Sequence, residues 1–379
     1  MRTAYDVLPS PCFVLEEALL RANLETLRHV QVETGCTILL ALKGVSMFSA
    51  FPIMREYLPG VTASSLNEAR LGFEEFGGEV HACAPIYTEA EMEEWLGYVS
   101  HMTFNSLSQW DRFQSRLKAV RDRVSSGLRI NPEHSEVATA LYNPGQPGSR
   151  LGVPADEVAD CLPDGIEGVH MHVLCECNAD ALDRTVDVLE RKFAPLLKAA
   201  RWLNLGGGHH ITRADYDVPH LIRIIQRLRE KYAAAIILEP GEAVGWRAGV
   251  LVATVQDIVT HAGRTTLMLD TSFSAHMPDC LEMPYKPAVQ GARDPGPDEP
   301  GVWLGGNTCL AGDTIGAYVF EHRPDVGDRL VLEDMIHYTM VKTTMFNGVR
   351  HPAIAIHRGS GRFDLIREFG YADYRNRLS

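Results

Sequence analysis

The chain is predicted to fold as an α/β protein, a (βα)8 TIM barrel followed by a mostly β domain. From residue 37 to about residue 240, short apolar runs alternate with longer amphipathic segments, which is typical of parallel strands covered by helices. There are eight such runs, the number that a closed barrel requires. After residue 243 the pattern changes to strand-like segments separated by glycine and proline.

Each of the eight runs is expected to be one barrel strand. Between them, segments 65–76 and 180–200 carry apolar residues at helical spacing, with Ser64, Ser65 and Asn178 as candidate helix caps. The strands are expected at residues 37–42, 61–64, 80–83, 101–104, 127–131, 168–173, 202–205 and 235–239.

The second domain is expected to contain strands and little helix. Residues 12–243 are assigned to the barrel, and residues 244–379, with about the first 11 residues, to the β-rich domain. The segment "DPGPDEPG" is expected to be a loop. The strand-like segments are residues 249–262, 264–273, 315–320, 328–334 and 338–344.

Composition limits the classes of function. With 379 residues, a net charge of −13 and a pI near 5.6, the chain is not expected to bind nucleic acid. The N-terminal segment has no signal-peptide core, and no stretch approaches the ~18 apolar residues of a membrane span. Eight cysteines without a CxxC pair fit reduced thiols. The sequence therefore predicts a cytoplasmic protein without membrane partners.

In "LLALKGVSMF", Lys43 follows the first strand. The C-terminal ends of the strands are where barrel enzymes carry out their chemistry. A poorly hydrated barrel mouth disfavours the ammonium form and lowers its pKa, and a neutral amine can attack an aldehyde to form a Schiff base. The alternative is a lysine whose stem packs in the barrel while its head reaches water.

The seventh and eighth strands end in "LNLGGGHHI" and "ILEPGEA". Gly206, Gly207 and Gly208 would let backbone N–H groups approach a phosphate, in a barrel loop that often holds one. Glu239 would project into the mouth, where a carboxylate can keep a pyridine nitrogen protonated. A glycine turn without a ligand and a solvated glutamate are the alternatives.

In "GVHMHVLCEC", His170 and His172 share one face of the sixth strand. An imidazole there can lie against a flat aromatic cofactor. Together with Cys175 and Cys177, the two histidines could also suggest a metal site. The alternation of side chains along a strand would point all four the same way, however, which is a poor match to tetrahedral coordination. We therefore expect no metal.

These strand-end groups match the parts of pyridoxal 5'-phosphate: an aldehyde, a ring, a phosphate and a pyridine nitrogen. The motifs "LALKG", "HMHVLCE", "LGGGHH", "EPGEA", "HMPD", "LEMPY" and "GGNTCLAGD" resemble the fold-type III decarboxylases of the ornithine and diaminopimelate decarboxylase group, which have an alanine-racemase-like barrel. Within that group they are most similar to the carboxynorspermidine/carboxyspermidine decarboxylases.

The resemblance implies a role for each residue of the site. Lys43 would bind the aldehyde, His172 would stack on the ring, and Glu239 would pair with the pyridine nitrogen. The phosphate would be held by Gly206, Gly207, Gly208 and Tyr338. A second subunit would supply Cys309 and Asp313, so that a homodimer shares its active sites, and Cys309 would return a proton after decarboxylation.

The chain departs from the wider group after "EPG", where Glu242 replaces an arginine. With Asp270 and Asp279, this anion would suit a small polycationic amino acid as substrate. The acid that usually follows the cysteine directly is displaced to Asp313. Three alternatives remain: an ornithine or diaminopimelate decarboxylase, an amino acid racemase, and a non-catalytic pyridoxal phosphate carrier.

Overall fold

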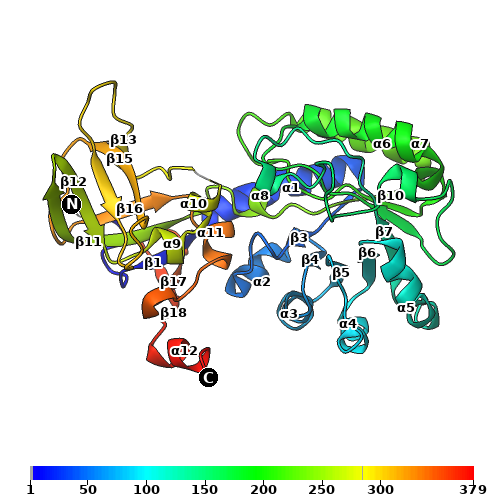
Figure 1. Ribbon diagram of the computed structural model, residues 1–379, viewed down its shortest axis with the longest axis horizontal. Coiled ribbons are helices and arrows are strands. Elements are labelled where there is room, and N and C mark those ends of the chain that lie inside the picture. The colour runs from blue at the N-terminus through cyan, green and yellow to red at the C-terminus, as the bar shows by residue number, and fades with distance from the viewer. Residues whose placement is uncertain (1–2, 284) are drawn as a thin grey trace. The chain divides into compact units, whose positions relative to one another are not determined.

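The computed structural model describes residues 3–283 and 285–379, which form two compact units. Residues 23–244 make up the barrel unit, and the chain up to residue 22 joins residues 245–379 in the sheet unit. Figure 1 shows the strands and helices of both. None of the described helices is long and apolar enough to cross a membrane.

The barrel unit contains all eight expected strands, joined in one parallel ring. Its strand order is β2-β10-β9-β8-β7-β6-β5-β4-β3. The first expected strand is divided at Leu39: β2 pairs with β10 and β3 pairs with β4, which closes the ring. The strands are β2 (Thr37–Ile38), β3 (Leu40–Ala41), β4 (Gly60–Ala63), β5 (Glu79–Cys83), β6 (His101–Phe104), β7 (Ser125–Arg129), β8 (Gly168–His170), β9 (Trp202–Asn204) and β10 (Ala235–Leu238).

Helices cover the outside of this ring, and in Figure 1 α6 and α7 lie side by side. Ser65 caps α3 and Asn178 caps α6, as expected, whereas Ser64 donates its amide to Glu68 instead of capping. The helices are α1 (Glu17–Thr34), α2 (Phe51–Met54), α3 (Leu66–Leu71), α4 (Met92–Tyr98), α5 (Leu107–Ala119), α6 (Ala179–Ala199), α7 (Val218–Tyr232) and α8 (Glu242–Gly245), with a π-helical turn at Gly72–Phe76 and 3-10 turns at Phe48–Ala50, Ala140–Tyr142 and Ala155–Glu157.

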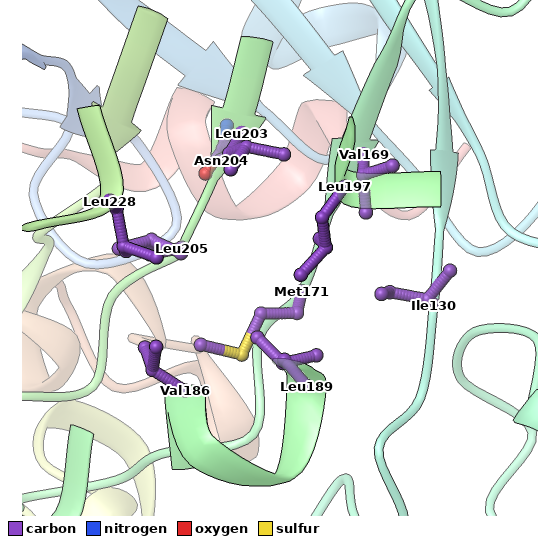
Figure 2. Close-up of a pocket in the computed structure, with 10 residues that line it drawn as sticks. All are labelled: Ile130, Val169, Met171, Val186, Leu189, Leu197, Leu203, Asn204, Leu205 and Leu228. Carbon is purple, nitrogen blue, oxygen red and sulfur yellow. The ribbon is translucent and has the colours of Figure 1, made fainter. Parts of the chain in front are cut away.

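The core of the barrel unit lies between the strands and these helices. A cavity of about 10 Å³ remains in this layer, next to β8, β9, α6 and α7 (Figure 2). This volume is about the least that can hold one water molecule, and every lining residue but Asn204 is apolar, so the cavity is a packing gap and not a ligand site. Its lining residues are Ile130, Val169, Met171, Val186, Leu189, Leu197, Leu203, Asn204, Leu205 and Leu228.

The sheet unit is built on a second sheet, in the order β13-β15-β14-β12-β11-β1-β17-β18, with β16 also paired to β11. Its strands are β1 (Cys12–Glu16), β11 (Gly249–His261), β12 (Arg264–Leu269), β13 (Ala292–Arg293), β14 (Val302–Gly305), β15 (Thr314–Phe320), β16 (Arg329–Glu333), β17 (Ala353–His357) and β18 (Phe363–Arg367). The short helices are α9 (Phe273–His276), α10 (Asp279–Glu282), α11 (Tyr338–Val341) and α12 (Tyr371–Asn376), with a 3-10 turn at Phe346–Gly348.

Two expectations about the sheet unit need correction. Strand β1, which we assigned to the barrel, pairs with β11 and β17, because its apolar side chains pack with those of β11 in one core. Residues 338–344, expected as a strand, begin with helix α11. Lys342 at its end pairs with Asp279 and Glu282 of α10, contacts that favour a helical turn over extended backbone.

Candidate active site

Lys43 lies two residues beyond β3, at the C-terminal end of the barrel strands. Its Nζ is 3.2 Å from Nε2 of His172. The side chain is accessible to solvent, yet protein surrounds it closely. Burial and the nearby Arg129 lower the pKa of Lys43. The lysine therefore has the environment of a group that loses its proton more readily than a surface lysine.

His172 lies two residues beyond β8 and contacts two other parts of the site. Its Nδ1 accepts a hydrogen bond from the amide of Gly207 at 3.3 Å, which leaves the proton of the neutral imidazole on Nε2, facing Lys43. Burial and the charges of Lys43 and Arg129 hold the pKa of His172 well below its usual range. His172 is thus a neutral ring held beside the amine.

Glu239 directly follows β10, and its carboxylate is buried. Oε1 accepts a hydrogen bond from Nδ2 of Asn204 at 2.7 Å, and Oε2 lies 3.3 Å from Nε2 of His170. Burial raises the pKa of Glu239, but the hydrogen bonds and the charge of His170 outweigh it and lower the pKa to about 2. The side chain is therefore a carboxylate at neutral pH.

The glycine loop after β9 fits tightly between neighbouring backbone segments. Gly206 and Gly208 have φ angles of +68° and +85°. A Cβ at Gly207 would collide with the carbonyl oxygen of Glu239, and one at Gly208 with that of Leu174. These contacts explain the run of glycines without a ligand.

The amides of this loop differ from our expectation of three free donors. Gly206 donates to Oδ1 of Asn204 at 2.9 Å, and Gly207 donates to His172. The Gly208 amide donates to no atom in the part of the chain that the structure describes. A phosphate at this loop would therefore bind first at Gly208.

Glu242 begins α8 and forms an ion pair with His210, with 3.1 Å between Oε2 and Nε2. His210 belongs to the same loop as the three glycines. The carboxylate expected to face the substrate thus already has an imidazole partner within its own unit, and its substrate role stays a prediction.

Three residues that we did not expect also lie at strand ends near these groups. Cys83 ends β5, Arg129 ends β7 and Asn204 ends β9. Arg129 is buried and donates through Nη2 to the carbonyl oxygen of His172 at 3.1 Å. Only Cys83 was the last residue of an expected strand. Asn204 stands inside the "LNLGGG" motif, and Arg129 lay inside the expected strand 127–131, whose end the structure moves to residue 129.

The other expected site residues belong to the sheet unit. Cys309 is exposed, and its amide donates to Oδ1 of Asn347 at 2.7 Å. Tyr338 begins α11, and its ring contacts His337 edge to face. The structure brings Lys43, His172, Glu239, Glu242 and the glycine loop together in the barrel unit, and the site roles of Cys309 and Tyr338 stay predictions.

The three aspartates of the sheet unit are held by contacts within it. Asp313 is 2% exposed and accepts hydrogen bonds from Ser272, Thr308 and the amides of Phe273 and Ser274. Asp279 pairs with Lys342 at 2.6 Å, and Asp270 accepts the amide of Thr254. Asp313 thus organises the loop that carries Cys309, and the substrate roles of all three aspartates stay predictions.

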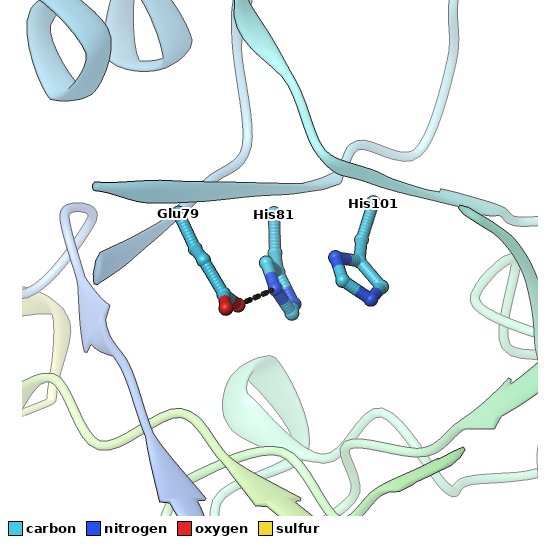
Figure 3. Close-up of side chains that lie close together, drawn as sticks. All are labelled: Glu79, His81 and His101. Atoms are coloured by element: carbon cyan, nitrogen blue, oxygen red, sulfur yellow. Dashed lines mark hydrogen bonds and ion pairs between the residues drawn. The ribbon is translucent and has the colours of Figure 1, made fainter. Parts of the chain in front are cut away.

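A separate polar cluster lies at the N-terminal ends of β5 and β6 (Figure 3). It contains Glu79, His81 and His101, whose candidate ligand atoms lie within 4.8 Å of one another. The two imidazoles stack, with ring centroids 3.8 Å apart and an angle of 26° between the planes. Nitrogen lone pairs lie in the ring planes, so those of two stacked rings do not converge on one ion about 2 Å from each. This geometry favours a stacked polar pair over a metal site.

A (βα)8 barrel followed by a β domain is the architecture of the fold-type III pyridoxal phosphate enzymes. The chain belongs to the family described as pyridoxal-dependent decarboxylase, C-terminal sheet domain, which matches residues 6–336. It is therefore an enzyme of the carboxy-lyase class, and the resemblance inferred from its motifs is confirmed.

Full-length relatives place the chain within this family. It is 51% identical over 372 residues to the carboxyaminopropylagmatine decarboxylase of Synechocystis, covering 98% of this chain and 96% of the relative. It is 42% identical over 381 residues to the carboxynorspermidine/carboxyspermidine decarboxylase of Campylobacter jejuni, covering 98% of each. The crystal structure of carboxynorspermidine decarboxylase from Campylobacter jejuni, complexed with norspermidine, matches with a TM-score of 0.90 at 41% identity, over 98% of this chain and all of that one.

Proposed function

We propose that the chain decarboxylates carboxynorspermidine and carboxyspermidine to norspermidine and spermidine, with pyridoxal 5'-phosphate as cofactor. This proposal rests on one observation: Lys43, His172, Glu239 and the glycine loop lie together at one end of the barrel. Relatives of that name that match over the full length support the substrate.

The residues of the barrel fit pyridoxal phosphate group by group. Lys43 has a lowered pKa, as an amine that binds an aldehyde requires. Glu239 is ionised and can face a pyridinium, and the free amide of Gly208 can bind a phosphate oxygen. The cofactor, when bound, supplies an electron sink for the bond to the leaving carboxylate.

The chain's own side chains orient the cofactor and the substrate, and they transfer protons. His172, neutral and fixed by Gly207, offers a flat apolar face beside Lys43. Lys43 would hold the cofactor through its aldehyde, and its amine lies 3.2 Å from Nε2 of His172. Cys309 returns a proton to the former α-carbon. In this proposal Cys309 comes from the partner in a cytoplasmic homodimer, and Tyr338 contacts the phosphate.

A second substrate is favoured by the 51% identity to a carboxyaminopropylagmatine decarboxylase. Carboxyaminopropylagmatine and carboxynorspermidine share an α-amino carboxylate head and a secondary amine. The tail of the first ends in a guanidinium, and the tail of the second ends in an ammonium. A site built for one can discriminate strongly against the other, because a guanidinium forms paired hydrogen bonds with a carboxylate.

The test compares carbon dioxide release from carboxynorspermidine, carboxyspermidine and carboxyaminopropylagmatine, with ornithine and diaminopimelate as further substrates. The proposal expects the highest kcat/KM for one of the two triamines. Higher kcat/KM for the guanidinium substrate would transfer the function to the second candidate. Release from ornithine or diaminopimelate alone, or from no substrate, would overturn both.

A further inference from the structure

Glu239, which directly follows β10, contacts two buried side chains at the ends of β8 and β9. His170, at the end of β8, is 0% exposed, and Asn204, at the end of β9, is 3% exposed. His170 lies 3.3 Å from one carboxylate oxygen and Asn204 lies 2.7 Å from the other. Both oxygens of Glu239 thus have a partner from the barrel wall.

The orientation of these two partners is itself fixed by further contacts. Oδ1 of Asn204 accepts the Gly206 amide at 2.9 Å, which leaves Nδ2 to donate to Glu239. Nδ1 of His170 lies 3.8 Å from Sγ of Cys83. Asn204 therefore links the carboxylate to the glycine loop, and His170 links it to the end of β5.

The charges around this cluster favour an ion pair. The titratable groups whose charges interact with Glu239 or His170 include Lys43, Arg129, His81, Cys83, His172 and Tyr87. Burial lowers the pKa of His170, but Cys83 and Glu239 raise it to about 9. His170 is consequently an imidazolium at neutral pH, next to a carboxylate.

We propose that His170 and Asn204 are positioning residues that keep the Glu239 carboxylate ionised and fix its direction toward the cofactor's pyridine nitrogen. This inference rests on the proposed function for the identity of the cofactor. The imidazolium of His170 lies 3.3 Å from the carboxylate, so it lowers the proton affinity of Glu239 more than that of the more distant pyridine nitrogen. The proton between Glu239 and the cofactor therefore stays on the pyridine nitrogen. His170 therefore acts through Glu239 and does not touch the substrate.

The first test needs no substitution. The imidazole of His170 is titrated by nitrogen-15 NMR in the full chain, free and loaded with pyridoxal phosphate. We expect a doubly protonated ring at pH 7.5 with a midpoint near 9, against about 6.5 for a free imidazole. A neutral ring at pH 7.5 would overturn the inference. Since this titration needs no substrate, its outcome is independent of which amino acid is decarboxylated.

The second test follows the proton on the cofactor. Protein is loaded with pyridoxal phosphate labelled with nitrogen-15 in its ring, and the ring shift is compared among wild type, His170→Gln and Asn204→Asp. We expect a protonated ring nitrogen in wild type and loss of that proton in both variants. His220→Gln is the control. It removes an imidazole on helix α7 that lies 2.9 Å from the carboxylate of Asp183 on helix α6. An unchanged shift in His170→Gln, or an equal change in His220→Gln, would refute the role.

Discussion

Lys43 differs from the other lysines of the chain because it is held at a strand end with neutral His172 at 3.2 Å. Lys43→Ala removes the amine that we propose binds the aldehyde, so we expect kcat to fall at least about 10³-fold, roughly 4 kcal/mol of activation free energy. Carbon dioxide release measures this loss, and borohydride reduction followed by peptide mass analysis locates the label. Lys118→Ala, which removes a surface lysine paired with Asp164, is the control. A label on a different lysine would contradict the assignment.

The Glu239–His170 pair gives the stability of the chain a defined pH dependence. The pKa of Glu239 falls from 4.5 to about 2, so its contribution is complete above pH 4.5 and is lost as the pH falls through 2. Cys83 and Glu239 raise the pKa of His170 from 6.5 to about 9, so its contribution is complete below pH 6.5 and is lost as the pH rises through 9. Both contributions are therefore complete between pH 4.5 and 6.5.

Glu239→Gln breaks this buried pair, and we expect it to lower the free energy of unfolding by about 3–5 kcal/mol at pH 6. The loss should shrink as the pH rises from 6.5 to 9.5, which urea unfolding at several pH values will show. Glu74→Gln breaks the surface pair with Arg70 and should cost less than about 1 kcal/mol, without this pH dependence. A cost for Glu239→Gln that does not change with pH would contradict the ion pair.

At the scale of single residues, the sequence indicated those side chains that interrupt an apolar run. Lys43 and Glu239 are charges at strand ends, so they could be predicted without a structure. The partners of Glu239 could not. His170 and Asn204 end different strands, and the arrangement of β8, β9 and β10 in sequence across the sheet brings both to one carboxylate.

At the scale of elements, the glycine loop needs both a positive φ angle and space for close packing against neighbouring backbone. Gly208→Ala forces a side chain onto a φ of +85° and against the carbonyl oxygen of Leu174. We expect a cost of about 2–5 kcal/mol, since a left-handed residue costs roughly 1–2 and overpacking roughly 1–3 kcal/mol. Pyridoxal phosphate affinity should fall as well, because the Gly208 amide moves.

Gly263→Ala is the matched control for this loop. Gly263 has a similar φ of +80°, but a Cβ there meets nothing within 4 Å. The substitution should therefore cost only about 1–2 kcal/mol and leave cofactor affinity unchanged. Thermal unfolding and cofactor titration of both variants separate the two contributions. Equal costs at the two positions would show that packing against Leu174 is unimportant.

Helices and strands were predictable where local pattern and tertiary packing agree. Barrel strand β6 occupies the expected residues, because its apolar run is buried between two parallel neighbours. Residues 338–344 show the limit. Their β-branched residues favour a strand, but residues 338–341 form a helical turn, and Lys342 after it pairs with Asp279 and Glu282 of α10. Such pairs join distant parts of the chain and leave no local signal.

At the scale of the whole molecule, the division of the chain was harder to predict than its fold class. The second boundary of the barrel is marked by a change in residue pattern near residue 244. The first is not, because β1 has the same apolar character as a barrel strand. Its assignment depends on pairing with β11 and β17, which lie more than 200 residues away.

The proposed homodimer makes a prediction about mixtures of inactive chains. If a barrel unit takes Cys309 from the partner, then a dimer of one Lys43→Ala chain and one Cys309→Ala chain has one site with both residues intact. Random reassociation after mild dissociation should restore roughly a quarter of wild-type activity, since half the dimers are mixed and each has one working site. A mixture of Lys43→Ala and Glu239→Gln should stay inactive, because both substitutions lie in the barrel unit. Activity that returns equally in both mixtures, or in neither, would mean that Cys309 does not serve the partner's site.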